Sequence, residues 1–598
     1  MALTRRFFLK NLAVSSIGLT VLPSSLVSGI MLPNDRKQKD GFKVDLKSPI
    51  CIYNNWAAYD ELSDNVKLTE QIAMKQLDEV IRLKKFGVQI DAYLMDMFWF
   101  DKDGGFREFR KESWPNGADR WFEKCKENNI LPGLWFSTNV VSWGSPWINP
   151  ANEWKDSFSA DGKYLCLFHG GYLDHLMQTL QLWYNKGVRV YKFDFANFNA
   201  ATPEIEATML PQDIVENNIQ AWLTALKVFK LKNPDAIFQA YNGYGGDHLS
   251  THSSFKKNID LRWLEVFDSL FCGDPRPSDV PMINFWRSKD LYSDHMVAQY
   301  KFNGVPLQAI DNCGFMIGNT GTCYGRKNTA WKGTYLLSLA RGGYINNIYG
   351  DLTYLSDEDA KWISAVQTIF NQAQKFGKTS LWGGLPGASV PYGYYTELPK
   401  GEIFTIINPT QTTAVISLPK KLKDAKLLFK DDGFIPVIAS DQITLGPEQI
   451  ALIGTGDYSS INDLGTNKDI IIPQKISELK VVWTGSAKRK TSKIKVDSVG
   501  HIRVVTMQSK GDAPYRSSGG WLPWGKPVSD IIKITIINKK KNLELTKTYD
   551  RIIWSGISWG VCELEINEEL LYKELEISVF TEENENVTID GKVFFVNY

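Results

Sequence analysis

Short hydrophobic runs alternate with amphipathic stretches between about residues 50 and 350 of the chain. Each run of apolar or aromatic residues ends in polar or glycine residues, and the stretch after it has helical spacing. Before the fourth run, for example, Leu173, Leu176, Leu180 and Tyr184 fall on one face of a predicted helix. The eight runs span residues 50–56, 91–100, 131–137, 188–195, 236–243, 268–274, 307–313 and 344–350.

Strands that alternate with helices in this way predict an α/β fold with a parallel sheet. Eight such units fit a (β/α)8 TIM barrel, which we place at residues 40–377. An open, doubly wound sheet is the alternative, because periodicity alone does not show whether a sheet closes into a ring.

The pattern changes after residue 377, where short β-prone runs are separated by turn residues such as Asn-Pro, Asp-Gly and Gly-Pro. We predict an antiparallel β-domain at residues 378–456, a polar linker at 457–468 and a C-terminal β-sandwich at 470–598. Within the sandwich, Trp521 and Trp524 stand in a glycine-rich segment, which is either a sugar-binding loop or a buried turn.

The first 30 residues have the pattern of an export signal. Arg5 and Arg6 precede Phe-Leu-Lys and an apolar stretch at residues 12–27 that is interrupted by small residues. This resembles a twin-arginine signal and predicts a periplasmic or secreted protein, the alternative being a basic N-terminus or a membrane anchor. No later stretch approaches 18 uninterrupted apolar residues, so we expect the mature protein not to span a membrane.

The amino-acid composition limits the kinds of molecule that the protein is expected to bind. Across 598 residues, 68 Lys and Arg stand against 67 Asp and Glu, so the net charge of +1 gives no reason to expect nucleic acid. The 13% aromatic content, with 20 Trp, suits either a large core or flat platforms for sugar rings. The seven cysteines form no CxxC pair, so neither a structural zinc site nor a disulfide scaffold is supported.

Chemistry in a barrel of this kind belongs at the carboxyl ends of the strands. The residues there are mainly carboxylates, amides and tryptophans, which suit a sugar, and two carboxylates across one bond suffice for glycoside hydrolysis. Asp194 is the strongest candidate, because a carboxylate at the end of an apolar strand, two residues after Lys192, is costly to bury unless it is paired or functional. Its alternative role is to cap the next helix.

One further motif matches a catalytic pattern by its letters. Residues 556–560 read Gly-Ile-Ser-Trp-Gly, as in a nucleophile elbow. An elbow needs a helix directly after the serine, whereas residues 561–566 alternate as a strand does. We therefore interpret the match as coincidence.

Five segments together resemble a known family. They are residues 55–59 (Asn-Trp-Ala-Ala-Tyr), 96–100 (Asp-Met-Phe-Trp-Phe), 114–117 (Trp-Pro-Asn-Gly), 132–136 (Pro-Gly-Leu-Trp-Phe) and 191–194 (Tyr-Lys-Phe-Asp). In this order and spacing they resemble glycoside hydrolase family 36, the melibiase or α-galactosidase group. Residues 311–312, 317–319 and 342–352 are similar to the last strands of the related family 27.

The resemblance implies a retaining α-glycosidase that hydrolyses terminal α-galactoside-like residues of a carbohydrate with two aspartates and no metal or cofactor. It implies Asp194 as nucleophile and Asp274 as acid/base, with Asp268 and Asp290 as alternatives for the acid/base. Hydroxyl-binding and pocket-lining roles fall to Trp56, Asp96, Trp99, Trp135, Lys192, Asn242 and Asp311.

The chain also departs from the family pattern. Met97 replaces the second aspartate of the family's Asp-Asp pair, and the fifth run lacks the family's arginine. Galactose is therefore a default expectation, and the alternatives are an α-N-acetylgalactosaminidase, a β-L-arabinopyranosidase, a transglycosidase or a non-catalytic carbohydrate-binding protein on a degenerate barrel.

Overall fold

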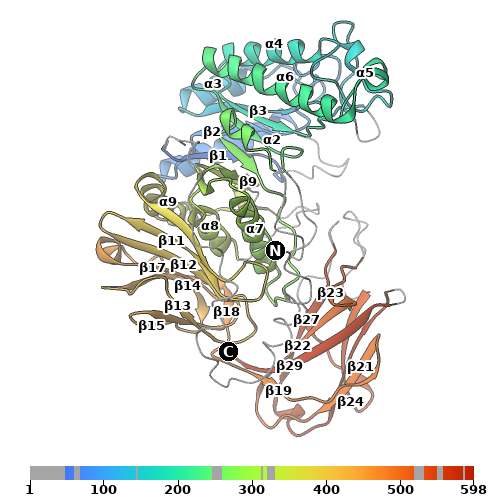
Figure 1. The fold of residues 1–598 in the computed structure, drawn as a ribbon. Helices are drawn as coiled ribbons and strands as arrows, with labels where there is room; N and C mark the ends of the chain where they lie inside the picture. The colour runs from blue at the N-terminus through green and yellow to red at the C-terminus, as the bar shows by residue number, and fades with distance from the viewer. Residues whose placement is uncertain are drawn as a thin grey trace.

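A computed structural model describes residues 48–58, 68–142, 146–245, 259–311, 314–318, 330–517, 531–547, 556–583 and 586–598 (Figure 1). The predicted export signal at residues 1–30 and the segment with Trp521 and Trp524 lie outside these ranges, so both stay predictions. Of the helices in these ranges, none combines the length and the hydrophobicity that a membrane crossing requires.

The N-terminal part of the chain is built on nine parallel strands. They are β1 (Ile50–Asn54), β2 (Ala92–Met95), β3 (Leu131–Ser137), β4 (Val190–Asp194), β5 (Ile237–Ala240), β6 (Ser269–Phe271), β7 (Ile310–Asp311), β8 (Met316–Ile317) and β9 (Ile345–Gly350). Their order is β7-β6-β5-β4-β3-β2-β1-β9-β8. Apart from β1 and β9, neighbours in the sheet are thus neighbours in the chain, whereas a doubly wound sheet reverses direction at a switch point, so the doubly wound alternative is wrong.

The two shortest strands share the seventh position of a ring. β7 pairs with β6, and β8 pairs with β9. At the amino end of this position, the Tyr344 N–H donates to the Gln308 carbonyl at 2.8 Å, which joins the start of β9 to the segment before β7. The predicted (β/α)8 barrel is therefore confirmed, with its seventh strand split in two.

The connecting helices are α2 (Glu70–Lys85), α3 (Asp119–Glu127), α4 (Tyr172–Asn185), α5 (Pro203–Thr208), α6 (Pro211–Lys232), α7 (Phe285–Phe302), α8 (Trp331–Ala340) and α9 (Asp357–Phe376). Local chemistry sets several of their starts: the Thr69 hydroxyl caps α2, and Ser356 and Asp359 form a capping box on α9. Outward-facing Phe193 on β4 packs edge-on against Trp222 of α6, as expected where a helix covers a strand.

The strand positions that point into the barrel follow the period of two that strands impose. At the amino end they are apolar and form a separate cluster that includes Ile52, Leu94, Val190 and Ile345. Two residues further along the same strands stand Asn54, Asp96, Lys192 and Asn347. The barrel is thus filled with hydrocarbon at one end and with polar groups toward the other.

Two sheets follow the barrel, antiparallel except that β18 runs parallel to β14 (Figure 1). The larger consists of β10 (Lys378–Gly383), β11 (Tyr392–Leu398), β12 (Gly401–Ile407), β14 (Lys426–Gly433), β17 (Ile450–Gly454) and β18 (Thr466–Ile472); the smaller of β13 (Ala414–Ser417), β15 (Val437–Ile438) and β16 (Gln442–Leu445). β18 pairs with β14, and the amide of Asn467 donates to Asp431 at 3.1 Å. The predicted linker at 457–468 is therefore wrong in its last three residues, 466–468, which belong to this sheet.

The C-terminal region forms two further sheets. One contains β19 (Lys475–Leu479), β22 (Gly500–Lys510), β23 (Ala513–Pro514), β26 (Thr546–Lys547), β27 (Trp559–Ile566) and β29 (Thr588–Asn597). The other contains β20 (Thr484–Ser486), β21 (Arg489–Ile494), β24 (Ile532–Asn538), β25 (Lys541–Asn542) and β28 (Leu575–Thr581). Since β27 begins at Trp559, no helix follows Ser558, which agrees with the rejection of the nucleophile elbow.

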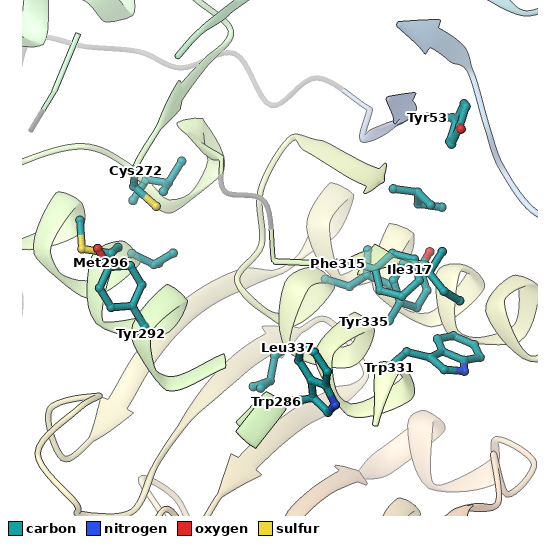
Figure 2. Packing of buried hydrophobic residues seen from close by; sticks show 14 of the residues in the cluster. Tyr53, Cys272, Trp286, Tyr292, Met296, Phe315, Ile317, Trp331, Tyr335 and Leu337 are labelled. Carbon is teal, nitrogen blue, oxygen red and sulfur yellow. The ribbon is translucent and has the colours of Figure 1, made fainter. Parts of the chain in front are cut away.

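Helix α7 is buried along nearly its whole length, from Phe285 to Tyr300. Its apolar side joins the core that continues into α8, and Figure 2 shows Tyr292 and Met296 of α7 with Trp331 and Tyr335 of α8 in this cluster. Its charged residues are neutralised by partners: Arg287 lies 2.8 Å from Asp431 of β14 and 3.4 Å from Asp290. A buried ion network thus joins the barrel to the antiparallel sheet.

We predict that Arg287→Ala lowers the free energy of unfolding by about 3–5 kcal/mol, because it removes the cation that two buried carboxylates share. Urea denaturation measures this loss. The matched control is Lys493→Ala, which breaks an exposed ion pair with Glu574 and should leave the free energy of unfolding nearly unchanged. A loss at Arg287 no larger than the control would contradict this account of α7.

Candidate active site

The carboxylate of Asp194 ends β4 and is 5% exposed. Its Oδ1 accepts hydrogen bonds from the Phe195 N–H at 2.9 Å, the Asn242 N–H at 3.0 Å and the Asn242 side-chain amide at 2.9 Å. Its Oδ2 accepts one from Trp135 Nε1 at 3.1 Å. The two oxygens are thus unequal: among the described residues, three donors hold Oδ1 and one holds Oδ2.

Backbone geometry holds these donors in place. Phe195, directly after Asp194, adopts the left-handed region with φ of 50°, which is costly for a phenylalanine. Gly243, directly after Asn242, has φ of 102°, and a Cβ there would lie 2.1 Å from the Ala196 carbonyl oxygen. Asn242 in turn accepts from the Ala196 N–H at 2.9 Å. The loops after β4 and β5 are therefore in direct backbone contact at Asp194.

A buried ion pair lies one inward position below Asp194. Lys192 Nζ stands 2.7 Å from Asp96 Oδ2, and both side chains are at most 5% exposed. Asn55 accepts from the Asp96 N–H at 2.8 Å, and the Lys192 ammonium also lies 4.1 Å from the Tyr241 ring centroid. Asp96 and Lys192, which the sequence analysis placed in one site, are thus in direct contact.

Asp311, at the end of β7, joins the same polar interior from the opposite side of the barrel. Its carboxylate accepts from Gln239 Nε2 at 3.0 Å, from the Tyr241 hydroxyl at 3.0 Å and from Asn347 Nδ2 at 2.7 Å. Tyr241 also hydrogen-bonds Tyr349. These contacts cross the barrel between β5, β7 and β9, so Asp311 lies in its interior.

Burial alters the acidity of both inward carboxylates. It raises the pKa of Asp194 above its ordinary value, opposed by the Lys192 charge and by the hydrogen bond from Trp135. It raises the pKa of Asp311 to about 6, opposed first by the hydrogen bond from Tyr241. The hydrogen bonds that Asp194 accepts favour its anionic form, which is the form that a nucleophile needs.

The three acid/base candidates are separated by the fold. Asp274 follows β6 at the carboxyl end of the barrel, and its carboxylate lies 3.9 Å from Arg276 Nη2. Asp268 precedes β6 at the opposite end, where it accepts from Lys230 and from the Phe238 N–H. Asp290 lies on α7, where Thr334 donates to it at 2.8 Å. Only Asp274 of these three is at the end that carries Asp194.

The tryptophans divide between site and core. Trp135 contacts Asp194 directly, and Trp56 is half-buried at the end of β1. Trp99 is fully buried, with its ring edge against Trp183 of α4 at 5.4 Å. We therefore assign Trp99 to the core, which corrects its predicted pocket-lining role. Phe98, the residue before it, lies in the turn after β2 and has a positive φ of 76°.

Sequence reasoning missed Gln239 and Tyr349 as site residues. Both face the barrel interior, two residues from Tyr241 and Asn347 respectively along the same strands. The available signal was the period of two on β5 and β9, because inward positions recur at every second residue. Extending this alternation to the last residues of β5 and β9 would have identified Gln239 and Tyr349.

No family model and no curated protein matches the chain. Among solved structures it is similar to the galactosidase domain of an α-galactosidase–sucrose kinase (15% identity, 68% of this chain and 54% of that chain, TM-score 0.47). It is also similar to two enzymes of Geobacillus stearothermophilus, a family 36 α-galactosidase (14%, 68% and 55%, TM-score 0.46) and a family 27 β-L-arabinopyranosidase (13%, 69% and 97%, TM-score 0.44).

The match spans just over half the length of the first two of these structures. At sequence identities of 13–15%, these similarities indicate the fold, and the reaction must be inferred from the residues of the site.

We predict that Asp311→Asn removes a pH dependence of stability. The folded chain holds the Asp311 proton with a pKa of about 6, above the ordinary 3.8, so this group stabilises the folded state at low pH and loses that contribution as pH rises through 6. A pKa change of this size corresponds to about 3 kcal/mol. The difference in unfolding free energy, wild type minus variant, should fall by about that amount between pH 4 and pH 7. A constant difference over this range would contradict the prediction.

Proposed function

We propose that this chain is a retaining α-glycosidase in which Asp194 is the nucleophile and Asp274 the acid/base. The observation that carries the proposal is the asymmetric hydrogen bonding of Asp194. Three donors hold Oδ1, while Oδ2 accepts one hydrogen bond from the described residues, so Oδ2 keeps a lone pair for attack. If Asp194 only capped a helix, its carboxylate would not need four hydrogen bonds that fix it at the end of the barrel.

The reaction proceeds in two displacements. In the first, Asp194 Oδ2 bonds to the anomeric carbon, the glycosidic C–O bond breaks, and the leaving oxygen takes the proton of Asp274. In the second, water attacks the anomeric carbon, Asp274 takes a proton from that water, and the bond to Asp194 breaks. Configuration at the anomeric carbon is retained because it inverts twice.

The polar interior below Asp194 supplies the sugar contacts in this proposal. Lys192 and Asp96 offer a paired donor and acceptor at the bottom of the site. Trp56, half-buried after β1, offers aromatic surface, whereas Trp135 is fully buried and acts through its hydrogen bond to Asp194. Neutral sugar hydroxyls can exchange hydrogen bonds with a charge pair that is already neutralised. We propose α-galactoside-like residues as substrates, on the resemblance of the sequence segments given above.

Asp194→Gly is the decisive substitution. We predict that it lowers kcat/KM on aryl α-galactosides by about 10⁴-fold or more, because no covalent intermediate can form. Sodium azide should restore turnover and give a glycosyl azide of inverted configuration, since the anion enters the space left by the carboxylate. Steady-state rates and product NMR measure both effects.

The matched control is Asp103→Asn, an exposed carboxylate in the loop after β2, which should change kcat/KM by less than about twofold. The substrate panel includes aryl α-N-acetylgalactosaminide and β-L-arabinopyranoside. Turnover retained in Asp194→Gly without azide would refute the nucleophile. Sugar binding without turnover by the wild type across the panel would favour a carbohydrate-binding protein.

A further inference from the structure

The loop between β6 and α7, which carries Asp274, is irregular and yet buried. Every residue from 272 to 280 is buried, although none of them belongs to a helix or strand. Loops normally run over the surface, because buried backbone N–H and carbonyl groups need hydrogen-bond partners. The partners of this loop must therefore come from other parts of the chain.

The C-terminal sandwich provides one set of partners. Arg516 Nη2 donates to the Pro277 carbonyl at 2.7 Å, and Trp559 Nε1 donates to the Ser278 carbonyl at 2.9 Å. Arg516 Nε also donates to the buried carboxylate of Asp279 at 2.9 Å, and the Ser558 hydroxyl donates to it at 3.1 Å. The Ser-Trp pair that imitates a nucleophile elbow in the sequence is thus part of a contact on this loop.

The antiparallel domain holds the other end of the loop. The Glu448 carboxylate accepts from the N–H groups of Ile283 and Asn284 at 2.8 and 3.0 Å. Gln411 donates to the Pro281 carbonyl at 2.7 Å. Arg503, on β22 of the sandwich, donates to Gln411 at 2.8 Å and lies 3.6 Å from Glu448. Both β-domains therefore converge on the segment that follows Asp274.

The segment between Asp274 and these contacts is stiff. Pro275 and Pro277 fix their own φ angles, and each proline also restricts the residue before it, which places Asp274 and Arg276 under constraint. A shift of residues 277–279 is therefore transmitted to Asp274, because the intervening residues have few soft dihedrals to absorb it.

We propose that the C-terminal sandwich positions the acid/base of the barrel, with Arg516 as the positioning residue that acts on Asp274 through residues 277–279. This inference rests on the proposed function, in which Asp274 donates a proton to the leaving oxygen. A general acid must lie within hydrogen-bond reach of that oxygen, and a displacement of 1 Å can cost about 100-fold in rate. The sandwich is then part of the catalytic apparatus.

The experiment compares two substrates in the full-length Arg516→Gln variant. An aryl glycoside with a phenol leaving group needs the proton of Asp274, whereas one with a 2,4-dinitrophenol leaving group departs without it. We expect kcat/KM to fall about 10- to 100-fold for the phenyl glycoside and less than about threefold for the dinitrophenyl glycoside. Arg516→Lys, which keeps the charge toward Asp279, should recover part of the loss.

The control is Lys533→Gln, which breaks an exposed ion pair of the same domain with Glu582 and should alter neither substrate. If Arg516→Gln does not fold, Trp559→Phe removes the hydrogen bond from Trp559 Nε1 to the Ser278 carbonyl and should show the same selectivity at smaller size. Equal losses on both substrates, or no loss on either, would overturn the positioning role.

The same measurements on Asp274→Ala separate the two proposals. Selective loss on the phenyl glycoside in Asp274→Ala but not in the Arg516 variants refutes the positioning role alone. Absence of selectivity in Asp274→Ala itself refutes the acid/base assignment on which this inference rests.

Discussion

The cost of placing charge inside a closed barrel constrains the whole structure. Asp194, Asp96, Lys192 and Asp311 are all buried at the carboxyl end of one ring of strands, where an uncompensated charge would be expensive. The chain meets this cost with the Lys192–Asp96 pair and with hydrogen bonds from neighbouring strands. These contacts exist only when β2, β4, β5, β7 and β9 stand in one ring, so barrel closure and the site depend on each other.

The same constraint recurs outside the barrel. Arg287 with Asp431, and Arg516 with Asp279, are ion pairs that cross from barrel segments to the β-domains. Such pairs give little net stability over hydrophobic contacts, but they tolerate only one arrangement of the elements that carry them. We infer that the β-domains contribute geometry to the loop after β6, beyond the area that they bury.

Much of the fold followed from the sequence because it depends on local periodicity. All eight predicted strand runs contain an observed strand, and the position of Asp194 at the end of β4 follows from its apolar neighbours. What failed depends on contacts distant in sequence. Trp99 lies in the core against Trp183 of α4, and residues 466–472 joined a sheet through pairing with β14. The hydrogen bonds of Arg516 join residues more than 230 positions apart, which no local pattern reveals.

The central claim, that Asp194 forms a covalent bond to the sugar, is tested most directly by mass spectrometry of a trapped intermediate. In Asp274→Ala, a dinitrophenyl glycoside still glycosylates the enzyme, but the second displacement lacks its base, so the intermediate accumulates. The account predicts that the protein mass rises by one glycosyl residue and that peptide mapping places it on Asp194. A label on another residue, or product release with no adduct at any time, would contradict it.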